Sequence, residues 1–268
     1  MEPDILIAVA SAAISLISVL VTTVSARRVT LLQDRLAKER HEQTKAELAE
    51  QLLSRYREPL LWSAHALQGR LFNAVELGFL ANYLHCGDPD DERYTRDYTV
   101  YVLADYLCWV EIIRREQQFL DLGDVTRNRT FFSYLDRLTQ IIAALDAPPQ
   151  FRLFRGQQRA LGELMLRRAD AANGPRLESV GYAEFCERLD TDPRFASWFA
   201  RLRSDVDVIA TADFPAKIRL VRMQHELINL IDFLDPDQAR LATPHRARVP
   251  EQVTRGHEGS APAPVDVR

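Results

Sequence analysis

Hydrophobic and polar positions divide the chain into an apolar run, a polar helical stretch, a long amphipathic region and a polar tail. Residues 5–24 form a run of twenty positions without charge, Pro or Gly. A helix of this length can cross a hydrocarbon core of about 30 Å. Residues 26–55 also lack Gly and Pro and are rich in good helix formers. We therefore predict a transmembrane anchor over residues 1–25 that continues into a helical stalk over residues 26–55.

One heptad register links the anchor with the stalk. Small residues on one face of a membrane helix let two helices approach closely, and apolar residues in the same register form a coiled-coil seam in water. This register predicts a parallel homodimer, and the alternative is that Ser, Thr and Ala reflect only the usual composition of spans. The residues of the register are Ala8, Ser11, Ser15, Ser18, Thr22 and Ser25 in the anchor and Val29, Leu32 and Leu36 in the stalk.

The amphipathic region, residues 56–235, has apolar residues at helical spacing and no sustained alternation of period two. Hydrophobic residues make up 47% of the chain, which is ample for one sizeable core. We predict an all-α multi-helix bundle in which residues 85–94 form a polar loop. The expected helices cover approximately residues 60–84, 95–120, 130–145, 155–169, 182–189, 193–209 and 215–234.

The polar tail differs in composition from the bundle. Residues 236–268 contain five prolines and no aromatic residue. Such a segment cannot bury enough apolar surface to offset the entropy of ordering its chain. We predict that residues 236–268 are disordered.

The charges that flank the apolar run predict its orientation. Residues 1–4 contain two acids and no Lys or Arg, whereas six basic residues lie between positions 27 and 45. Basic flanks stay in the cytoplasm, so we place the N-terminus outside the inner membrane and residues 27–268 in the cytoplasm. A cleaved signal peptide is the alternative, although such peptides begin with a basic segment. Three cysteines without CxxC spacing fit a reducing compartment.

Motifs that carry known chemistry are absent from the sequence. The chain has no GxGxxG, GxxxxGK(S/T), GxSxG or HExxH, so no catalytic class is indicated. The acidic residues 88–92 can hold a divalent cation through carboxylates, but they lack the alternating ligands and the Gly of an EF-hand. We predict a solvated loop there, and we expect no metal and no cofactor. The net charge of −4 gives no reason to expect nucleic acid as a partner.

Arg219 and His225, separated by five residues on the last predicted helix, resemble the Arg and His of HEPN ribonucleases. That resemblance implies ribonuclease activity, but it covers two residues only, and Leu220 stands where the family usually has a polar residue. Comparable spacing also occurs by chance in a chain so rich in Arg. The other pairs with such spacing are Arg35/His41 and Arg240/His245.

Polar residues interrupt the apolar faces of two predicted helices, within residues 56–73 and 154–165. Because buried polar groups need partners, we predict a polar pocket between these helices. A surface ion pair explains Arg159 and Glu163 equally well. The candidate site residues are Gln68, Arg70, Asn73, Gln158, Arg159 and Glu163.

The same two segments, with Tyr-Ala-Glu-Phe-Cys at residues 182–186, resemble an uncharacterised family of single-span, membrane-anchored helical proteins, mainly from actinobacteria. The resemblance covers most of residues 50–235. It implies an anchored helical domain and no particular activity.

These patterns favour a membrane-anchored binding, scaffolding or sensing protein whose helical domain captures an unknown cytoplasmic protein. One alternative is an enzyme of unknown class, such as a defence-type nuclease or hydrolase. The other is an effector whose span oligomerises and perturbs the bilayer. A pocket lined by converging ionisable groups would favour the enzyme, and a large exposed apolar patch would favour the scaffold. The sequence identifies no catalytic residue.

Overall fold

The computed structural model describes residues 56–116, 125–171 and 174–250 and, upstream of them, only Gln33, Arg40 and Thr44. Most of these residues are helical, which confirms the predicted fold class in outline. The described residues include no helix that is both long and apolar enough to cross a membrane. The predicted anchor, its heptad register and most of the stalk lie outside the described residues.

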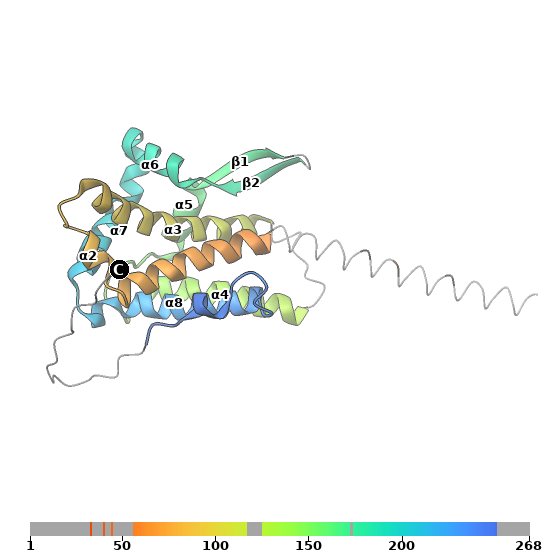
Figure 1. Ribbon diagram of the computed structural model, residues 1–268. Coiled ribbons are helices and arrows are strands. Elements are labelled where there is room, and N and C mark those ends of the chain that lie inside the picture. Colours follow the sequence, from red (N-terminus) through yellow and green to blue (C-terminus); the bar gives the residue numbers. More distant parts are fainter. Residues whose placement is uncertain are drawn as a thin grey trace, which may run out of the picture.

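The long helices lie side by side, and one β-hairpin projects at a corner (Figure 1). Helix α3 is central because it packs against α2, α5, α6, α7 and β2, while α4 packs along α8. The elements are a helix over residues 56–75, α2 (Phe79–Tyr83), α3 (Pro89–Glu116), α4 (Val125–Ala143), α5 (Arg155–Leu164), β1 (Leu166–Ala171), β2 (Gly174–Ser179), α6 (Tyr182–Thr191), α7 (Pro193–Thr211), α8 (Phe214–Leu234) and the 3-10 helix η2 (Thr243–Arg246).

The acidic segment that we predicted to be a loop forms the start of α3. The Asp88 side chain accepts the backbone N–H of Asp90 at 2.9 Å and that of Asp91 at 3.4 Å. Pro89 occupies the first helical position, where its missing N–H has no consequence. Acidic side chains in the first turn also complement the positive end of the helix dipole. The predicted loop over residues 85–94 is therefore wrong from residue 89 onward.

The helix predicted over residues 60–84 is broken at Gly78. Helical structure ends at residue 75, and Gly78 has a φ of 63°, in the left-handed region. Gly adopts this conformation readily because it has no Cβ. The chain then resumes as the short α2.

The β1–β2 hairpin is a small addition to the mostly helical domain that our all-α prediction did not include. The two strands pair antiparallel, with Leu166 opposite Ser179 and Ala171 opposite Gly174. The helix predicted over residues 155–169 therefore ends at Leu164. Half of the twelve strand residues are charged or polar, so the strands show no sustained apolar alternation. Their one local signal is the Asn173-Gly174 pair, which favours hairpin turns.

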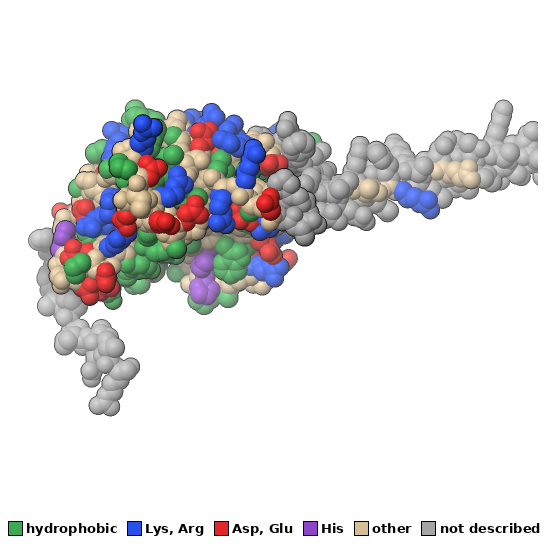
Figure 2. Space-filling model, turned by 90° about the horizontal axis from the view of Figure 1, so that it is seen from above, with side chains coloured by type: hydrophobic (Ala, Val, Ile, Leu, Met, Phe, Trp, Pro, Cys, Tyr) green, Lys and Arg blue, Asp and Glu red, His purple; other side chains and the backbone are tan. Residues whose placement is uncertain are grey.

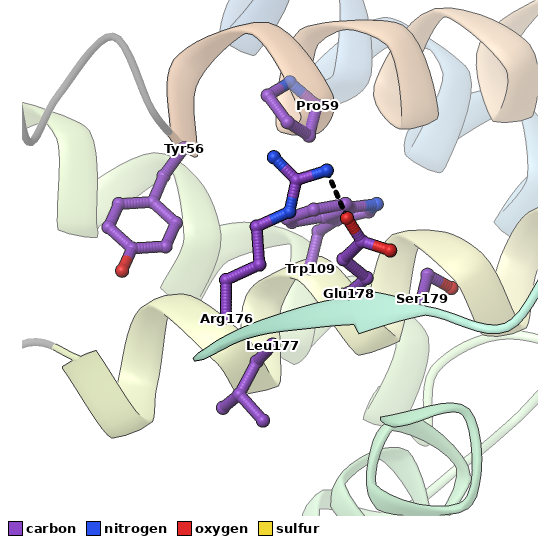
Figure 3. Close-up of a pocket in the computed structure, with 7 residues that line it drawn as sticks. All are labelled: Tyr56, Pro59, Trp109, Arg176, Leu177, Glu178 and Ser179. Atoms are coloured by element: carbon purple, nitrogen blue, oxygen red, sulfur yellow. Dashed lines mark ion pairs between the residues drawn. The ribbon is translucent and has the colours of Figure 1, made fainter. Parts of the chain in front are cut away.

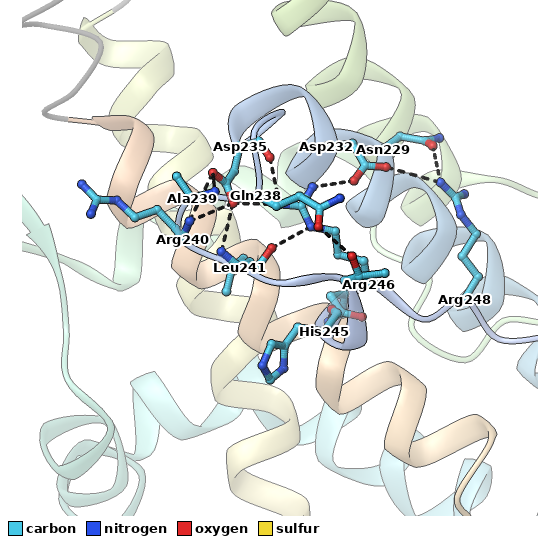
Figure 4. Close-up of polar contacts among 12 residues, drawn as sticks. Asn229, Asp232, Asp235, Gln238, Ala239, Arg240, Leu241, His245, Arg246 and Arg248 are labelled. Atoms are coloured by element: carbon cyan, nitrogen blue, oxygen red, sulfur yellow. Dashed lines mark hydrogen bonds and ion pairs between the residues drawn. The ribbon is translucent and has the colours of Figure 1, made fainter.

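The first part of the predicted disordered tail is ordered (Figure 4). Residues 236–250, which we call the C-terminal arm, pack against α8 and the helix over residues 56–75, with Leu241 and Val249 buried. The Asp235 carboxylate accepts three backbone N–H groups of the arm. The prediction was wrong for the arm because it counted apolar residues and overlooked bonds between side chains and the main chain. Residues 251–268 lie outside the described residues.

Candidate functional site

The best-developed polar site lies where α5 crosses α3 and approaches α4. Gln158, Leu161 and Gly162 are the buried residues of α5. Gly162 faces the main chain of α3 at Leu107, so α5 lies very close to α3. This seating brings Arg159 of α5 within 3.9 Å of Glu111 on α3.

Glu111 is the buried carboxylate of this site, with 2% of its side chain exposed. Nε of Arg114 lies 2.7 Å from Oε2, and Nε of Arg115 lies 2.7 Å from Oε1. Burial raises the pKa of Glu111, but these two guanidinium groups outweigh burial and hold the net pKa below its usual value. Glu111 is therefore ionised near neutral pH, which suits a structural anion better than an acid–base catalyst.

Two further ion pairs flank Glu111. Arg155 Nη2 lies 3.0 Å from Asp136 Oδ1, which links α5 to α4. Arg115 Nη2 lies 3.1 Å from Glu163 Oε1, which links α3 to α5. Each carboxylate of the cluster thus accepts a hydrogen bond from a guanidinium group.

Arg159 is the exception among the arginines of the cluster. Its Nη2 lies 3.8 Å from Glu163 Oε1, and its Nε lies 3.9 Å from Glu111 Oε2. Both distances exceed those of a hydrogen bond. The Arg159 side chain is also 55% exposed. Its guanidinium group is therefore the one best able to bind a ligand.

These side chains line a pocket of about 180 Å³, which we call the arginine pocket. Five of the nine lining residues are charged, two are uncharged and polar, and two are apolar side chains of α3. The lining residues are Leu107, Val110, Glu111, Arg114, Asp136, Thr139, Arg155, Gln158 and Arg159.

Three of the six predicted site residues belong to this region. Gln158 and Arg159 line the arginine pocket, and Glu163 pairs with the arginines beside it. Gln158 serves the fold, because its buried Nε2 donates to Thr139 O at 3.0 Å and to Leu153 O at 2.8 Å. Arg159 is the predicted residue that remains available to a ligand.

The other three predicted residues lie on the helix over residues 56–75 and do not line the arginine pocket. Gln68 is buried, and its Nε2 donates to His245 O of the C-terminal arm at 2.8 Å. Asn73 is half-buried. Arg70 is buried among aromatic rings, with its Cζ between 4.6 and 5.1 Å from three ring centroids. Those rings belong to Phe79, Tyr94 and Tyr98.

The Arg219/His225 pair, which resembles that of HEPN ribonucleases, has a structural role in this fold. Arg219 is 1% exposed, and its guanidinium group donates to six backbone carbonyl oxygens of residues 141–150. His225 Nε2 lies 2.8 Å from Val249 O of the C-terminal arm. A guanidinium group saturated by buried carbonyls is not available to a phosphate group.

A second pocket, of about 270 Å³, lies between β2, α3 and the helix over residues 56–75 (Figure 3). Beside it, the Asp105 carboxyl faces Trp109 and Ser179, and burial raises the pKa of Asp105 to about 6. The Ser179 hydroxyl oxygen is itself buried. The residues that line this hairpin pocket are Tyr56, Pro59, Trp109, Arg176, Leu177, Glu178 and Ser179.

The acidic residues proposed for a cation do not form a metal site in the described structure. Across residues 56–116, 125–171 and 174–250, no group of three or more His, Cys, Asp or Glu side chains is arranged to hold a metal ion. The Asp88 carboxylate instead caps α3.

Comparisons of the chain with protein-family models, curated proteins and solved structures gave no match. The resemblance to membrane-anchored helical proteins therefore stays a prediction from the sequence.

Proposed function

We propose that the chain is a membrane-anchored binding module whose helical domain captures an anionic ligand group in the arginine pocket. The anchor, its orientation and the parallel dimer belong to this proposal and rest on the apolar run at residues 5–24 and on its flanking charges. One observation carries the ligand site. Arg159 lines the pocket with a guanidinium group whose nearest carboxylate oxygens are 3.8 and 3.9 Å away.

The surrounding ion pairs support binding at Arg159. Arg114 and Arg115 are held by Glu111, and Arg155 is held by Asp136. These pairs occupy the neighbouring guanidinium groups, so Arg159 is the arginine of the lining without a carboxylate at hydrogen-bond distance. A guanidinium fork binds an oxyanion through two parallel N–H···O bonds.

The same ion pairs favour a binding site over a catalytic one. General acid–base catalysis needs a group whose pKa lies near the working pH, and the Arg114 and Arg115 guanidinium groups hold the pKa of Glu111 low against the effect of burial. Acidic and basic side chains are interspersed on the face shown in Figure 2. Nucleic-acid binding usually uses a basic patch, whereas the pocket lining combines three arginines with two acids. An anionic small molecule or protein group is therefore the ligand that we propose.

An enzyme is the second candidate, and Asp105 is the observation that favours it. A carboxyl with a pKa of about 6 beside a pocket is suited to proton transfer near neutral pH. However, the Ser179 oxygen that faces it is buried, so this oxygen is not exposed to a substrate as a nucleophile would be.

The proposal is tested by thermal unfolding of the full chain in detergent with acetate, phosphate or sulfate at constant ionic strength. We expect at least one anion to raise the unfolding midpoint of the parent. Arg159→Gln should remove that increase, because the amide cannot supply a charged fork. Arg129→Gln, at an exposed position of α4, is the matched control and should keep it. Equal responses of the parent and Arg159→Gln, or no response in either, would overturn the proposal.

A further inference from the structure

We infer that the ligand group of the arginine pocket is a single carboxylate attached to a short aliphatic group. This inference rests on the proposed function and names the chemistry of its ligand. Two sources present this chemistry, namely a small free carboxylic acid and the C-terminus of a protein that ends in an aliphatic residue.

The charge balance of the pocket favours an anion with one charge. Three arginines and two acids line it, which gives 3 − 2, or one net positive charge. Arg115 and Glu163 lie beside the lining and cancel each other. One carboxylate would neutralise the pocket, whereas a phosphate dianion would leave excess negative charge between the carboxylates of Glu111 and Asp136. Like charges at such distances repel, and the repulsion is stronger where water is partly excluded.

The available donors also fit a carboxylate. Arg114 directs both Nε and Nη2 at Glu111, and Arg155 directs Nη2 at Asp136. Arg159 is therefore the single guanidinium fork in the pocket lining that is not already committed to a carboxylate at hydrogen-bond distance. One planar fork matches the two oxygens of one planar carboxylate.

The apolar part of the lining sets the nature of the attached group. Leu107 is buried and Val110 is half-buried on the α3 side of the pocket. The volume of about 180 Å³ is below the roughly 300–1,000 Å³ of typical ligand pockets. The pocket can thus enclose a carboxylate and a short side chain but not a large ligand. The Gln158 amide N–H groups and the Thr139 hydroxyl donate to backbone carbonyls, so these two uncharged polar side chains offer no free donor to a polar substituent.

The test is a binding titration by calorimetry with the full chain in detergent. The probes are N-acetyl-leucine, an acetylated hexapeptide that ends in Ala-Leu with a free carboxylate, the same peptide as its C-terminal amide, and inorganic phosphate. We expect the free peptide acid to bind at least tenfold more tightly than its amide. Tighter binding of the peptide acid than of N-acetyl-leucine would assign the ligand to a protein C-terminus. Equal affinities of the two would assign it to a small acid.

Two variants connect the affinity to the pocket. Arg159→Gln should weaken binding of the acid at least tenfold. Arg159→Lys keeps the charge but loses the fork, so it should recover only part of the affinity. Arg159 is largely exposed, so both variants should keep the parent's unfolding midpoint, and Arg129→Gln should bind like the parent. Equal binding of the acid and the amide would overturn the inference. Binding of phosphate alone, dependent on Arg159, would overturn it and leave the proposed function standing, whereas a lack of any Arg159-dependent binding would remove both.

Discussion

Gly162 lies so close to Leu107 that a Cβ atom at Gly162 would come within 2.6 Å of the Leu107 carbonyl oxygen. Such a Cβ would also lie 3.1 Å from Cβ of Glu111. Since backbone atoms of a packed helix cannot move aside cheaply, only Gly allows α5 to seat on α3 at this distance. The geometry of the arginine pocket therefore depends on a residue that does not line it.

Gly162→Ala should destabilise the domain and open the arginine pocket. Overpacking of this kind costs about 1–3 kcal/mol, which urea unfolding of the full chain in detergent would measure. Gly156→Ala is the matched control on the same helix, because a Cβ there meets nothing within 4 Å. That change should be neutral or slightly stabilising, since Ala favours helix over Gly by up to about 1 kcal/mol. If both variants had the same stability, the close contact would not limit packing.

Arg219→Lys should destabilise the domain strongly. Lys has three donors and no planar fork, so it cannot satisfy the six carbonyl oxygens that Arg219 reaches. Buried acceptors left without partners cost about 1–3 kcal/mol each, and we expect a loss of about 3 kcal/mol in urea unfolding. Arg222→Lys, on the exposed side of α8, should change stability by less than about 0.5 kcal/mol. An unaltered stability of Arg219→Lys would contradict the structural role.

Helices with a regular apolar period and clear end signals are predictable from the sequence. The predicted helix over residues 193–209 corresponds to α7 (Pro193–Thr211), where Pro193 starts the helix and Asp192 accepts the N–H groups of Arg194 and Phe195. The hairpin was missed because its strands pair through the main chain and through one cross-strand ion pair, Arg167 with Glu178. Its two leucines that pack against the core, Leu166 and Leu177, are too few to give an apolar alternation.

The candidate site was predictable only in part, for a related reason. Polar residues on one helix can be found in the sequence, but the partners that face them from other helices cannot. Arg159 was identified, whereas Asp136 of α4 was not, because its approach depends on how α4 meets α5. Glu111 had a usable signal, since Arg114 and Arg115 follow it at the i,i+3 and i,i+4 spacing of helical ion pairs.

The ordered arm reverses an expectation about truncation. The composition of residues 240–268 predicts that their deletion leaves the unfolding midpoint of the domain unchanged. The structure instead predicts a loss of about 2 kcal/mol or more, because burial of Leu241 and Val249 contributes about 1.5–3 kcal/mol each before the cost of ordering the chain. Deletion of residues 251–268 alone is the control and should be nearly neutral. Thermal unfolding of the two truncated chains would decide, and equal midpoints would show that the arm adds no stability.

Self-association through the anchor is a prediction from the heptad register alone. In lipid, close packing of small residues must supply the attraction between helices, so Ser15→Ile should separate the two helices. Leu32→Glu should break the seam of the stalk in water. Both changes should reduce crosslinking of a single Cys introduced at Arg28 in a background without other cysteines, whereas Ser15→Ala should crosslink nearly as well as the parent. Equal crosslinking in all three variants, or none in the parent, would exclude a dimer through this helix.

Asp105 should make the stability of the domain depend on pH. Burial raises the pKa of this carboxyl from an ordinary value of 3.8 to about 6 in the folded protein. Between these two values the folded protein holds a proton that the unfolded chain has released. The contribution of Asp105 to stability is therefore greatest at low pH and falls as the pH rises through this range. Once both states are ionised, above about pH 7, the loss from this one group amounts to about 3 kcal/mol.

Asp105→Asn tests this dependence, because the amide stays neutral and can still accept a hydrogen bond from the Trp109 indole N–H that faces residue 105. Urea unfolding of the parent and the variant, from pH 4 to pH 8, gives a difference in which all other titrations cancel. Between pH 4 and pH 7, we expect the free energy of unfolding of the variant to rise relative to that of the parent by up to about 3 kcal/mol. This difference should not increase further at higher pH. A difference that stays constant across the range would mean that the Asp105 carboxyl titrates alike in the folded and unfolded chains. In that case the Asp105 carboxyl would not be suited to proton transfer near neutral pH. The observation that favours an enzyme would then no longer hold.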